Sequence, residues 1–129
     1  MSSPTKKLIS TGTKWEKIAG FSRALRIGQQ IFVAGTTATS KEGTVGKGNP
    51  AVQMQFILDR IENAIVDLGG KLADVVRTRI YVRNINDWEI VAKIHGERFR
   101  DIKPVSTLVQ AQLVGDCLVE VEADAILQN

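Results

Sequence analysis

The chain has 129 residues, the size of one domain with a single packed core that needs no metal or disulfide. Hydrophobic residues make up 43% and charged residues 24%, a composition that excludes a disordered chain. The net charge of +3, from 17 basic and 14 acidic residues, is too small to favour nucleic acid or an anionic membrane as a partner. We therefore expect one domain over residues 1–129, with no nucleic-acid and no membrane partner.

Cysteine and histidine each occur once, as Cys117 and His95. No internal disulfide can form, and the chain lacks the paired cysteines and histidines of a zinc site. Residues 1–7 carry no apolar leader segment, and no run approaches the roughly 20 apolar residues of a membrane span. We expect a soluble, cytoplasmic protein without a metal or other cofactor.

In chain order, residues 22–36 form two strand-like runs on either side of Gly28-Gln29, which predicts a tight hairpin. Residues 38–48 are rich in Gly, Thr, Ser and Lys, which predicts a surface loop. Asn49 and Pro50 are typical of a helix start, and Gly69-Gly70 of a helix end. Apolar residues recur between them at helical spacing, so an amphipathic helix is expected there.

Residues 76–83 alternate between apolar and basic or aromatic side chains, as in a strand with two different faces. A second helix is expected from Asn86, with Glu89 as its capping-box partner and Pro104 beyond its end. Two final strands, 106–113 and 118–126, are expected to form a hairpin around Gly115-Asp116. This order predicts an α+β fold, with a sheet covered by two helices on one face.

The second face of that sheet would carry the basic residues of strand 76–83 and the acidic residues of the last strand. If these strands are neighbours, opposite charges lie within reach of one another. Such a face is either open to solvent or buried against identical subunits, where Leu25, Phe32 and Leu108 would contribute apolar contacts if they fall on that face. The sequence leaves both interpretations open.

The chain resembles the Rid, or YjgF-like, family over nearly its whole length. The resemblance is carried by the segments at 19–36, 74–88, 104–109 and L-V-E-V-E-A-D-A at 118–125. It implies a chorismate-mutase-like α+β subunit, assembled as a homotrimer with a ligand cleft between each pair of subunits. Well-known members hydrolyse imines and enamines to 2-oxo acids and ammonia, and an older family name is endoribonuclease and translation inhibitor.

The resemblance also implies site residues. Glu120 matches the glutamate of the family's final motif and is the expected catalytic residue. The expected ligand-binding residues are an aromatic residue, a small-Gly pair with free backbone N–H groups, and two hydroxyl residues after the proline. These are Phe21, Ala34, Gly35, Ser106 and Thr107.

The family's arginine, which grips the substrate carboxylate just after the proline, is absent here. Its position is Ser106 or Val105, depending on the alignment, and Arg100 is a candidate to replace it from a few residues upstream. Such a loss removes a charge-assisted contact of roughly 1.5 to 3 kcal/mol. Glu120 could order a water, or it could instead be half of an ion pair with Arg77 or Arg79.

Three functions follow from these residues. The first is a Rid-like trimer that binds a small, anionic metabolite and hydrolyses an imine or enamine with altered specificity. The second is a non-catalytic protein whose cleft holds a metabolite or whose surface binds a protein. The third and weakest is an endoribonuclease or translation inhibitor, because no acid-base pair of the kind RNA cleavage needs is visible. The sequence alone leaves open whether the chain is an enzyme.

Overall fold

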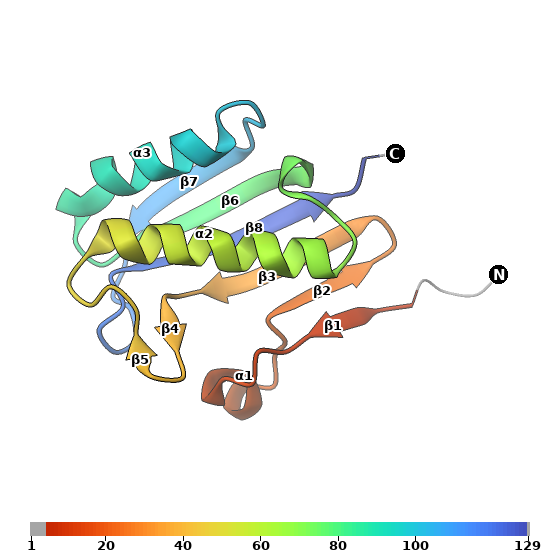
Figure 1. Ribbon diagram of the computed structural model, residues 1–129, viewed down its shortest axis with the longest axis horizontal. Helices are drawn as coiled ribbons and strands as arrows, with labels where there is room; N and C mark the ends of the chain where they lie inside the picture. The colour runs from red at the N-terminus through yellow and green to blue at the C-terminus, as the bar shows by residue number, and fades with distance from the viewer. Residues whose placement is uncertain (1–4, 129) are drawn as a thin grey trace.

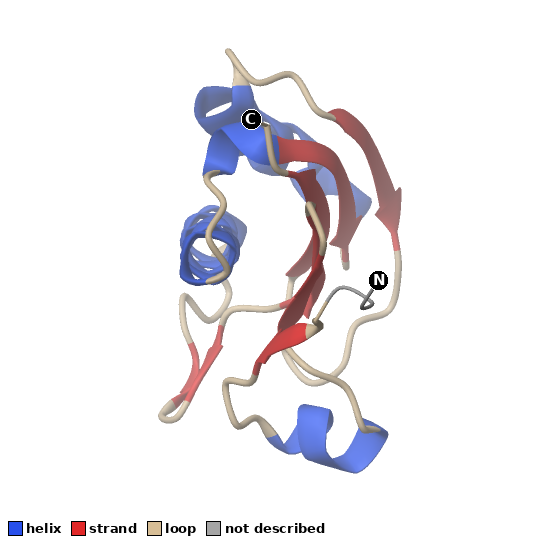
Figure 2. Ribbon diagram, turned by 90° about the vertical axis from the view of Figure 1, so that its right-hand side faces the viewer, coloured by secondary structure: helices blue, strands red, loops and turns tan. Residues whose placement is uncertain are grey.

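The computed structural model describes residues 5–128 and shows a six-stranded mixed sheet with two long helices on one face (Figures 1 and 2). The predicted α+β class is confirmed. Part of the 1–7 segment and the final residue lie outside the described residues. The sheet order is β1-β2-β3-β8-β6-β7, in which only β6 and β7 are parallel neighbours. The strands are β1 (Lys7–Ile9), β2 (Ala24–Ile27), β3 (Gln30–Thr36), β6 (Val75–Val82), β7 (Val105–Gln110) and β8 (Val119–Ile126).

The hairpin and the first long helix form as predicted. β2 and β3 pair across Gly28-Gln29, where Gly28 takes the positive φ of 59° that a tight turn requires. Helix α2 (Pro50–Asp67) begins at Asn49, whose side chain accepts a hydrogen bond from the backbone N–H of Val52 at 3.1 Å. The apolar stripe of α2 is buried against the sheet and forms the centre of the core, with Met54, Ile57, Leu58, Ile61, Ala64 and Ile65.

The start of the second long helix, α3 (Trp88–Phe99), differs from the prediction. Asn86 is not its cap, because it lies inside a short 3₁₀ turn, η2 (Ile85–Asp87), and α3 continues directly from that turn. Asn84 instead caps the turn by accepting a hydrogen bond from the backbone N–H of Asn86 at 3.0 Å. A capping motif therefore identified the right region but not the right residue.

Several short elements were not predicted. They are β1, α1 (Lys14–Ala19), the two-stranded ribbon of β4 (Thr39–Ser40) and β5 (Gly43–Thr44), and the 3₁₀ turn η1 (Leu72–Asp74). The β4–β5 ribbon lies in the stretch expected to be an irregular loop. Elements this short have too few residues for a periodic pattern, so periodicity could not reveal them.

The expected C-terminal hairpin is wrong. β7 and β8 do not pair, because β6 lies between them, parallel to β7 and antiparallel to β8. The chain from β6 through α3 to β7 is instead a crossover that covers the sheet, as parallel neighbours require. The connection from β7 to β8 then passes the end of β6, where the Arg83 guanidinium donates to the carbonyls of Leu113, Gly115 and Cys117.

The two faces of the sheet differ as the alternation predicted. α2 and α3 cover the apolar face, and the other face is free of helices (Figure 2). On the free face Arg79 lies 3.6 Å from Glu122 and 3.4 Å from Asp124, so the expected charge pairing across β6 and β8 is present. Leu25 and Phe32 lie side by side on this face, whereas Leu108 is opposite the buried Ile80 and packs on the core, so only the first two meet the condition for a contact there. None of the helices within residues 5–128 combines the length and apolarity of a bilayer crossing.

Candidate functional site

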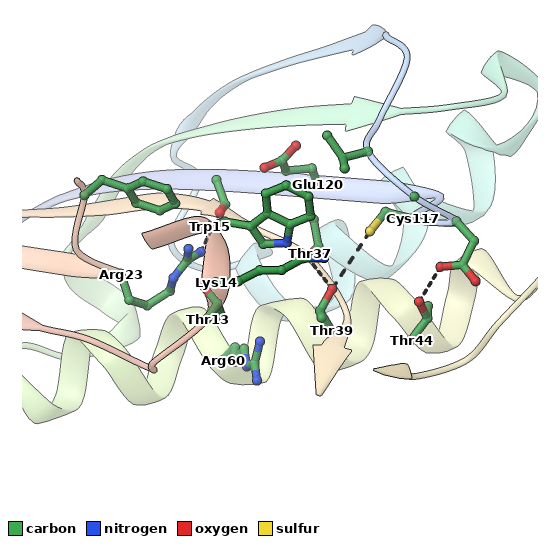
Figure 3. Close-up of a pocket in the computed structure, with 15 residues that line it drawn as sticks. Thr13, Lys14, Trp15, Arg23, Thr37, Thr39, Thr44, Arg60, Cys117 and Glu120 are labelled. Carbon is green, nitrogen blue, oxygen red and sulfur yellow. Dashed lines mark hydrogen bonds between the residues drawn. The ribbon is translucent and has the colours of Figure 1, made fainter. Parts of the chain in front are cut away.

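A pocket of about 370 Å³ lies where α1, the end of β3, α2 and the start of β8 meet (Figure 3). Its walls come from four segments far apart in the sequence: residues 13–23, residues 35–44, Arg60 of α2, and residues 114–120. The walls mix aromatic rings, two guanidinium groups and carboxylates. A pocket with a few converging polar groups is the usual form of a small-molecule site.

The first wall is α1, which one buried carboxylate holds in place. Glu16 accepts five hydrogen bonds from Ser10, Thr11 and Thr13, between 2.7 and 3.3 Å. Burial alone would raise the pKa of Glu16, but these hydrogen bonds outweigh it and lower the pKa to about 2. The network fixes the short helix that carries Lys14 and Trp15 into the pocket.

A second wall is the loop before β8. Arg83 holds three carbonyls of this loop, and the fully buried Gln53 of α2 supports it a second time by bridging two segments. Its side-chain amide donates to the carbonyl of Gly46 at 3.1 Å and accepts from the backbone N–H of Leu118 at 2.9 Å. Thr44 of β5 donates a hydrogen bond to Asp116. These bonds join the wall around Cys117 to the β4–β5 ribbon.

Glu120 lies at the start of β8, directly over Gly35 of β3. A methyl group added at Gly35 would come within 2.4 Å of the Glu120 Oε2 atom, so the glycine is what lets the carboxylate lie against the strand. Burial raises the pKa of Glu120, the charge of Arg23 partly opposes this, and the nearby Glu122 adds to it. Within residues 5–128 the Glu120 carboxylate makes no hydrogen bond or salt bridge.

The alternative role of Glu120 as an ion-pair partner of Arg77 or Arg79 is not what the structure shows. Glu120 lies opposite Tyr81 in the β6–β8 ladder, and Arg79 instead contacts Glu122 and Asp124. Tyr81 donates its hydroxyl hydrogen to Glu122 at 2.9 Å, which leaves Glu120 uninvolved. The carboxylate is thus free to meet a ligand or a water.

Arg23 lies between the aromatic wall and the sheet. Arg23 is buried, with 7% of its surface exposed. Its Nη1 atom donates to the carbonyl of Gly35 and, at 3.0 Å, to the hydroxyl of Thr36. The ring of Phe21 lies 5.6 Å from the guanidinium carbon. Burial lowers the pKa of Arg23, with Glu16 and Glu120 acting in the opposite direction.

The structure brings together three of the predicted site residues, Phe21, Gly35 and Glu120, in this pocket. Ala34 adjoins the pocket, but its backbone N–H donates to the Arg23 carbonyl at 2.9 Å and so does not face a ligand. That part of the prediction for the small-Gly pair is wrong. The main reason is that the β2–β3 pairing extends past the end of the regular hairpin.

The other three predicted residues lie outside the pocket of the single chain. Ser106 points to the helix-covered side of β7, where it accepts a hydrogen bond from Thr78 at 2.8 Å. Thr78 in turn contacts the His95 Nε2 atom at 2.8 Å. Thr107 lies exposed opposite Arg79, and Arg100 lies exposed at the end of α3, with its Nε atom 3.5 Å from the Gly96 carbonyl.

Sequence reasoning missed Trp15, Arg23 and Arg60 as pocket residues. Trp15 lines the pocket with 42% of its surface exposed, and a single tryptophan on a short helix carries no pattern in the sequence. Arg60 falls in the polar part of an otherwise clear amphipathic pattern, so the sequence marks it only as a surface residue. No local pattern marks Arg23, because alternation along the strand places it on the face opposite Ala24 and so predicts an ordinary surface residue.

Comparison with known proteins places this fold in a class. Residues 11–127 match the family model described as Endoribonuclease L-PSP. A crystal structure of a member of the YjgF/YER057c/UK114 family from Mycobacterium tuberculosis superposes with a TM-score of 0.85 at 41% sequence identity, covering 95% of this chain and 100% of that one. The architecture is therefore that of the YjgF-like, chorismate-mutase-like α+β proteins.

Two further relatives are similar along almost their whole length. A RutC family protein of Pyrococcus abyssi is 31% identical over 122 residues, covering 93% of this chain and 96% of the relative. A 2-iminobutanoate/2-iminopropanoate deaminase of Dermatophagoides farinae is 26% identical over 127 residues, covering 95% and 98%. The chain belongs to the Rid, or YjgF-like, family, as its resemblance predicted.

Proposed function

We propose that this protein binds small metabolites in the pocket and hydrolyses reactive imines or enamines there to oxo compounds and ammonia. The observation that carries the proposal is the state of Glu120. Its carboxylate lies over Gly35 at the pocket wall, without a hydrogen-bond partner among residues 5–128, and its pKa is raised mainly by burial. A carboxylate that is unpaired and more basic than usual is suited to accept a proton from water.

The reaction joins an iminium compound and water and releases an oxo compound and ammonium. The Glu120 carboxylate takes a proton from a water while the water oxygen bonds to the imine carbon, and the electron pair of the C=N bond moves to nitrogen. The protonated Glu120 returns that proton to nitrogen. The C–N bond then breaks to release ammonia, Glu120 takes the hydroxyl proton as the C=O bond forms, and that proton passes to the ammonia to give ammonium. One residue thus serves as base and then as acid.

The assembly that we propose is a homotrimer, as the family resemblance implies. The helix-free face carries Leu8, Leu25 and Phe32 in one row across three strands. Leu8 is 58% exposed and Phe32 is 40% exposed, and the row lies on the same face as the charged pairs of β6 and β8. An exposed mixture of apolar groups and paired charges suits a self-complementary interface. In such an assembly Ser106, Thr107 and Arg100 act only if they approach the pocket of a neighbouring subunit.

The relative named as a 2-iminobutanoate/2-iminopropanoate deaminase supports the reaction class. The description of the family model as an endoribonuclease would support RNA cleavage, but the modest charge gives that activity no further backing. Ser106 in place of the family's arginine favours a second candidate, a metabolite-binding protein without catalysis. Substituting Ser106→Arg separates the two, since a latent deaminase should gain imine hydrolysis and a binding protein should not.

The test is a direct assay of imine hydrolysis. An amino-acid oxidase generates 2-iminopropanoate in the presence of a trapping reagent, and added protein competes with the trap. We expect the wild type to accelerate imine loss and Glu120→Gln to lose a factor of about 100 or more. Glu97→Gln is the matched control, because it removes the same charge from an exposed position on α3 that lies outside the pocket lining.

The pH profile provides a second readout. Because Glu120 must be ionised to act as a base, acceleration by the wild type should fall on the acid side with a pKa above the ordinary 4.5 of a glutamate. Hydrolysis that is absent in the wild type, or that survives Glu120→Gln unchanged, would refute the catalytic proposal. The binding protein would then be the better description.

A further inference from the structure

The pocket contains an arginine with a buried donor that nothing in the described chain uses. Arg23 is 7% exposed, and its Nε atom is buried without a hydrogen-bond partner among residues 5–128. Buried donors are nearly always paired in folded proteins, so an exception calls for a partner from outside the chain. Nη1 is already bonded to Gly35 and Thr36, which holds the guanidinium in one orientation.

A second guanidinium lines the same pocket. Arg60 projects from α2 and packs on the ring of Phe56, with 5.0 Å between the guanidinium carbon and the ring centroid. Across the described residues it makes no hydrogen bond or ion pair. Arg60 is also one of the charges that lower the pKa of Arg23, after burial, so the two cations repel each other.

The carboxylate that would most readily neutralise them is already engaged. Glu16 is close enough to raise the pKa of both arginines, yet its two oxygens accept the five hydrogen bonds that hold α1. Lys14 adds a third cation to the pocket lining, with its Nζ atom 4.7 Å from the Trp15 ring centroid. The lining therefore holds three cationic side chains against the carboxylates of Glu120 and Asp116, and Asp116 is already paired with Lys47 and Thr44.

We propose that Arg23 and Arg60 form the anion-binding end of the pocket, so that the ligand is a small organic carboxylate whose reacting carbon faces Glu120. This inference rests on the proposed function and specifies its substrate class. Guanidinium groups suit a carboxylate because their planar N–H groups match its two oxygens. Trp15 and Phe21, exposed by 42% and 38%, supply apolar surface for the body of the ligand.

The arrangement also accounts for Ser106. The cation that the family resemblance places after the proline is here supplied by the segment before β2 and by α2. Arg100, the candidate replacement considered from the sequence, is exposed at the end of α3 and does not line the pocket. The carboxylate is therefore assigned to Arg23 and Arg60 and not to Arg100.

The experiment compares a charged and an uncharged form of one compound by calorimetric titration. The probes are 2-oxobutanoate and its amide, which have the same carbon skeleton. Arg60→Gln is the principal variant because Arg60 is only half-buried, and Arg100→Gln is the matched control with the same change of charge. We expect Arg60→Gln to weaken 2-oxobutanoate binding about tenfold or more and leave binding of the amide unchanged, with Arg100→Gln like the wild type.

Arg23→Lys extends the test by keeping the charge and removing the fork of donors. If it remains folded by circular dichroism, it should also weaken 2-oxobutanoate selectively. Carboxylate binding that is unaffected by Arg60→Gln, that is lost with Arg100→Gln, or that is absent in the wild type would overturn the inference. The imine assay is a separate measurement, so the two proposals can fail independently. Selective binding of 2-oxobutanoate without imine hydrolysis would refute only the catalytic proposal. Imine hydrolysis that is insensitive to Arg60→Gln would refute only the anion site.

Discussion

The carboxylate of Glu16 should be one of the largest single contributors to the stability of the pocket wall. We consider Glu16→Gln, which keeps the size of the side chain and removes its charge. The wild-type carboxylate accepts five hydrogen bonds from Ser10, Thr11 and Thr13. The amide has one acceptor oxygen where the carboxylate has two, and its NH₂ group would face the donors of Thr11 and Thr13.

The size of the effect follows from the pKa. Folding lowers the pKa of Glu16 from 4.5 to about 2. Each pKa unit corresponds to about 1.36 kcal/mol, so the ionised carboxylate contributes on the order of 3 kcal/mol at pH 7, as an upper bound. Because the folded pKa is the lower one, this stabilisation is complete above about pH 4.5 and is lost as the pH falls toward 2. By pH 3 the wild type should have lost roughly 2 kcal/mol of it.

The assay is urea unfolding at pH 7 and pH 3, followed by circular dichroism and by tryptophan fluorescence. Glu97→Gln is the control, because Glu97 is an exposed glutamate on α3 and its substitution changes the charge equally. We expect Glu16→Gln to lose about 2 to 3 kcal/mol at pH 7 and to depend less on pH than the wild type. A loss below about 1 kcal/mol with an unchanged acid dependence would show that the network does not stabilise the folded chain.

Three further substitutions test other parts of the structure. Gly35→Ala should lower the free energy of unfolding in urea by less than about 1 kcal/mol, because only the end of the Glu120 side chain must move. It should nevertheless reduce imine hydrolysis strongly, and unchanged hydrolysis would contradict the close approach of Glu120 to Gly35. Gln53→Leu should destabilise by about 1 to 3 kcal/mol in thermal or urea unfolding, since the Leu118 N–H loses its acceptor; a neutral effect would show that the bridge is dispensable. Arg79→Ala should change the free energy of unfolding of one chain by less than about 1 kcal/mol, because the ion pairs of Arg79 are partly exposed. It should nevertheless weaken a trimer in sedimentation measurements, and an unaffected oligomer would argue against burial of the helix-free face of the sheet.

Local features of the fold could be predicted because their causes are local. A glycine at a tight turn, an asparagine and proline at a helix start, and strict alternation in a half-buried strand each act over a few residues. The β2–β3 hairpin, α2 and the two faces of β8 were therefore correct. The order of these elements added the sheet with two helices on one face. The family resemblance added the position of Glu120, which no local pattern could supply.

The partner of β7 was decided by tertiary structure alone. β7 and β8 are consecutive strands, and consecutive strands often pair, but α3 needs β6 and β7 side by side to cover the apolar face. The pairing of Arg83 with three carbonyls of the β7–β8 connection stabilises this route across the end of β6. Strand propensity describes a surface that fits a sheet and does not specify which neighbour it meets.

The pocket shows the same division. Phe21, Gly35 and Glu120 could be named from motifs, whereas Arg23 and Arg60 are 37 positions apart and meet only because α2 packs across β3. In the sequence each is one basic residue among 17. The unpaired Nε atom of Arg23, the unpaired guanidinium of Arg60 and their shared pocket arise from folding. The free energy of a charge depends on the groups packed around it, and the sequence alone does not show which groups those are.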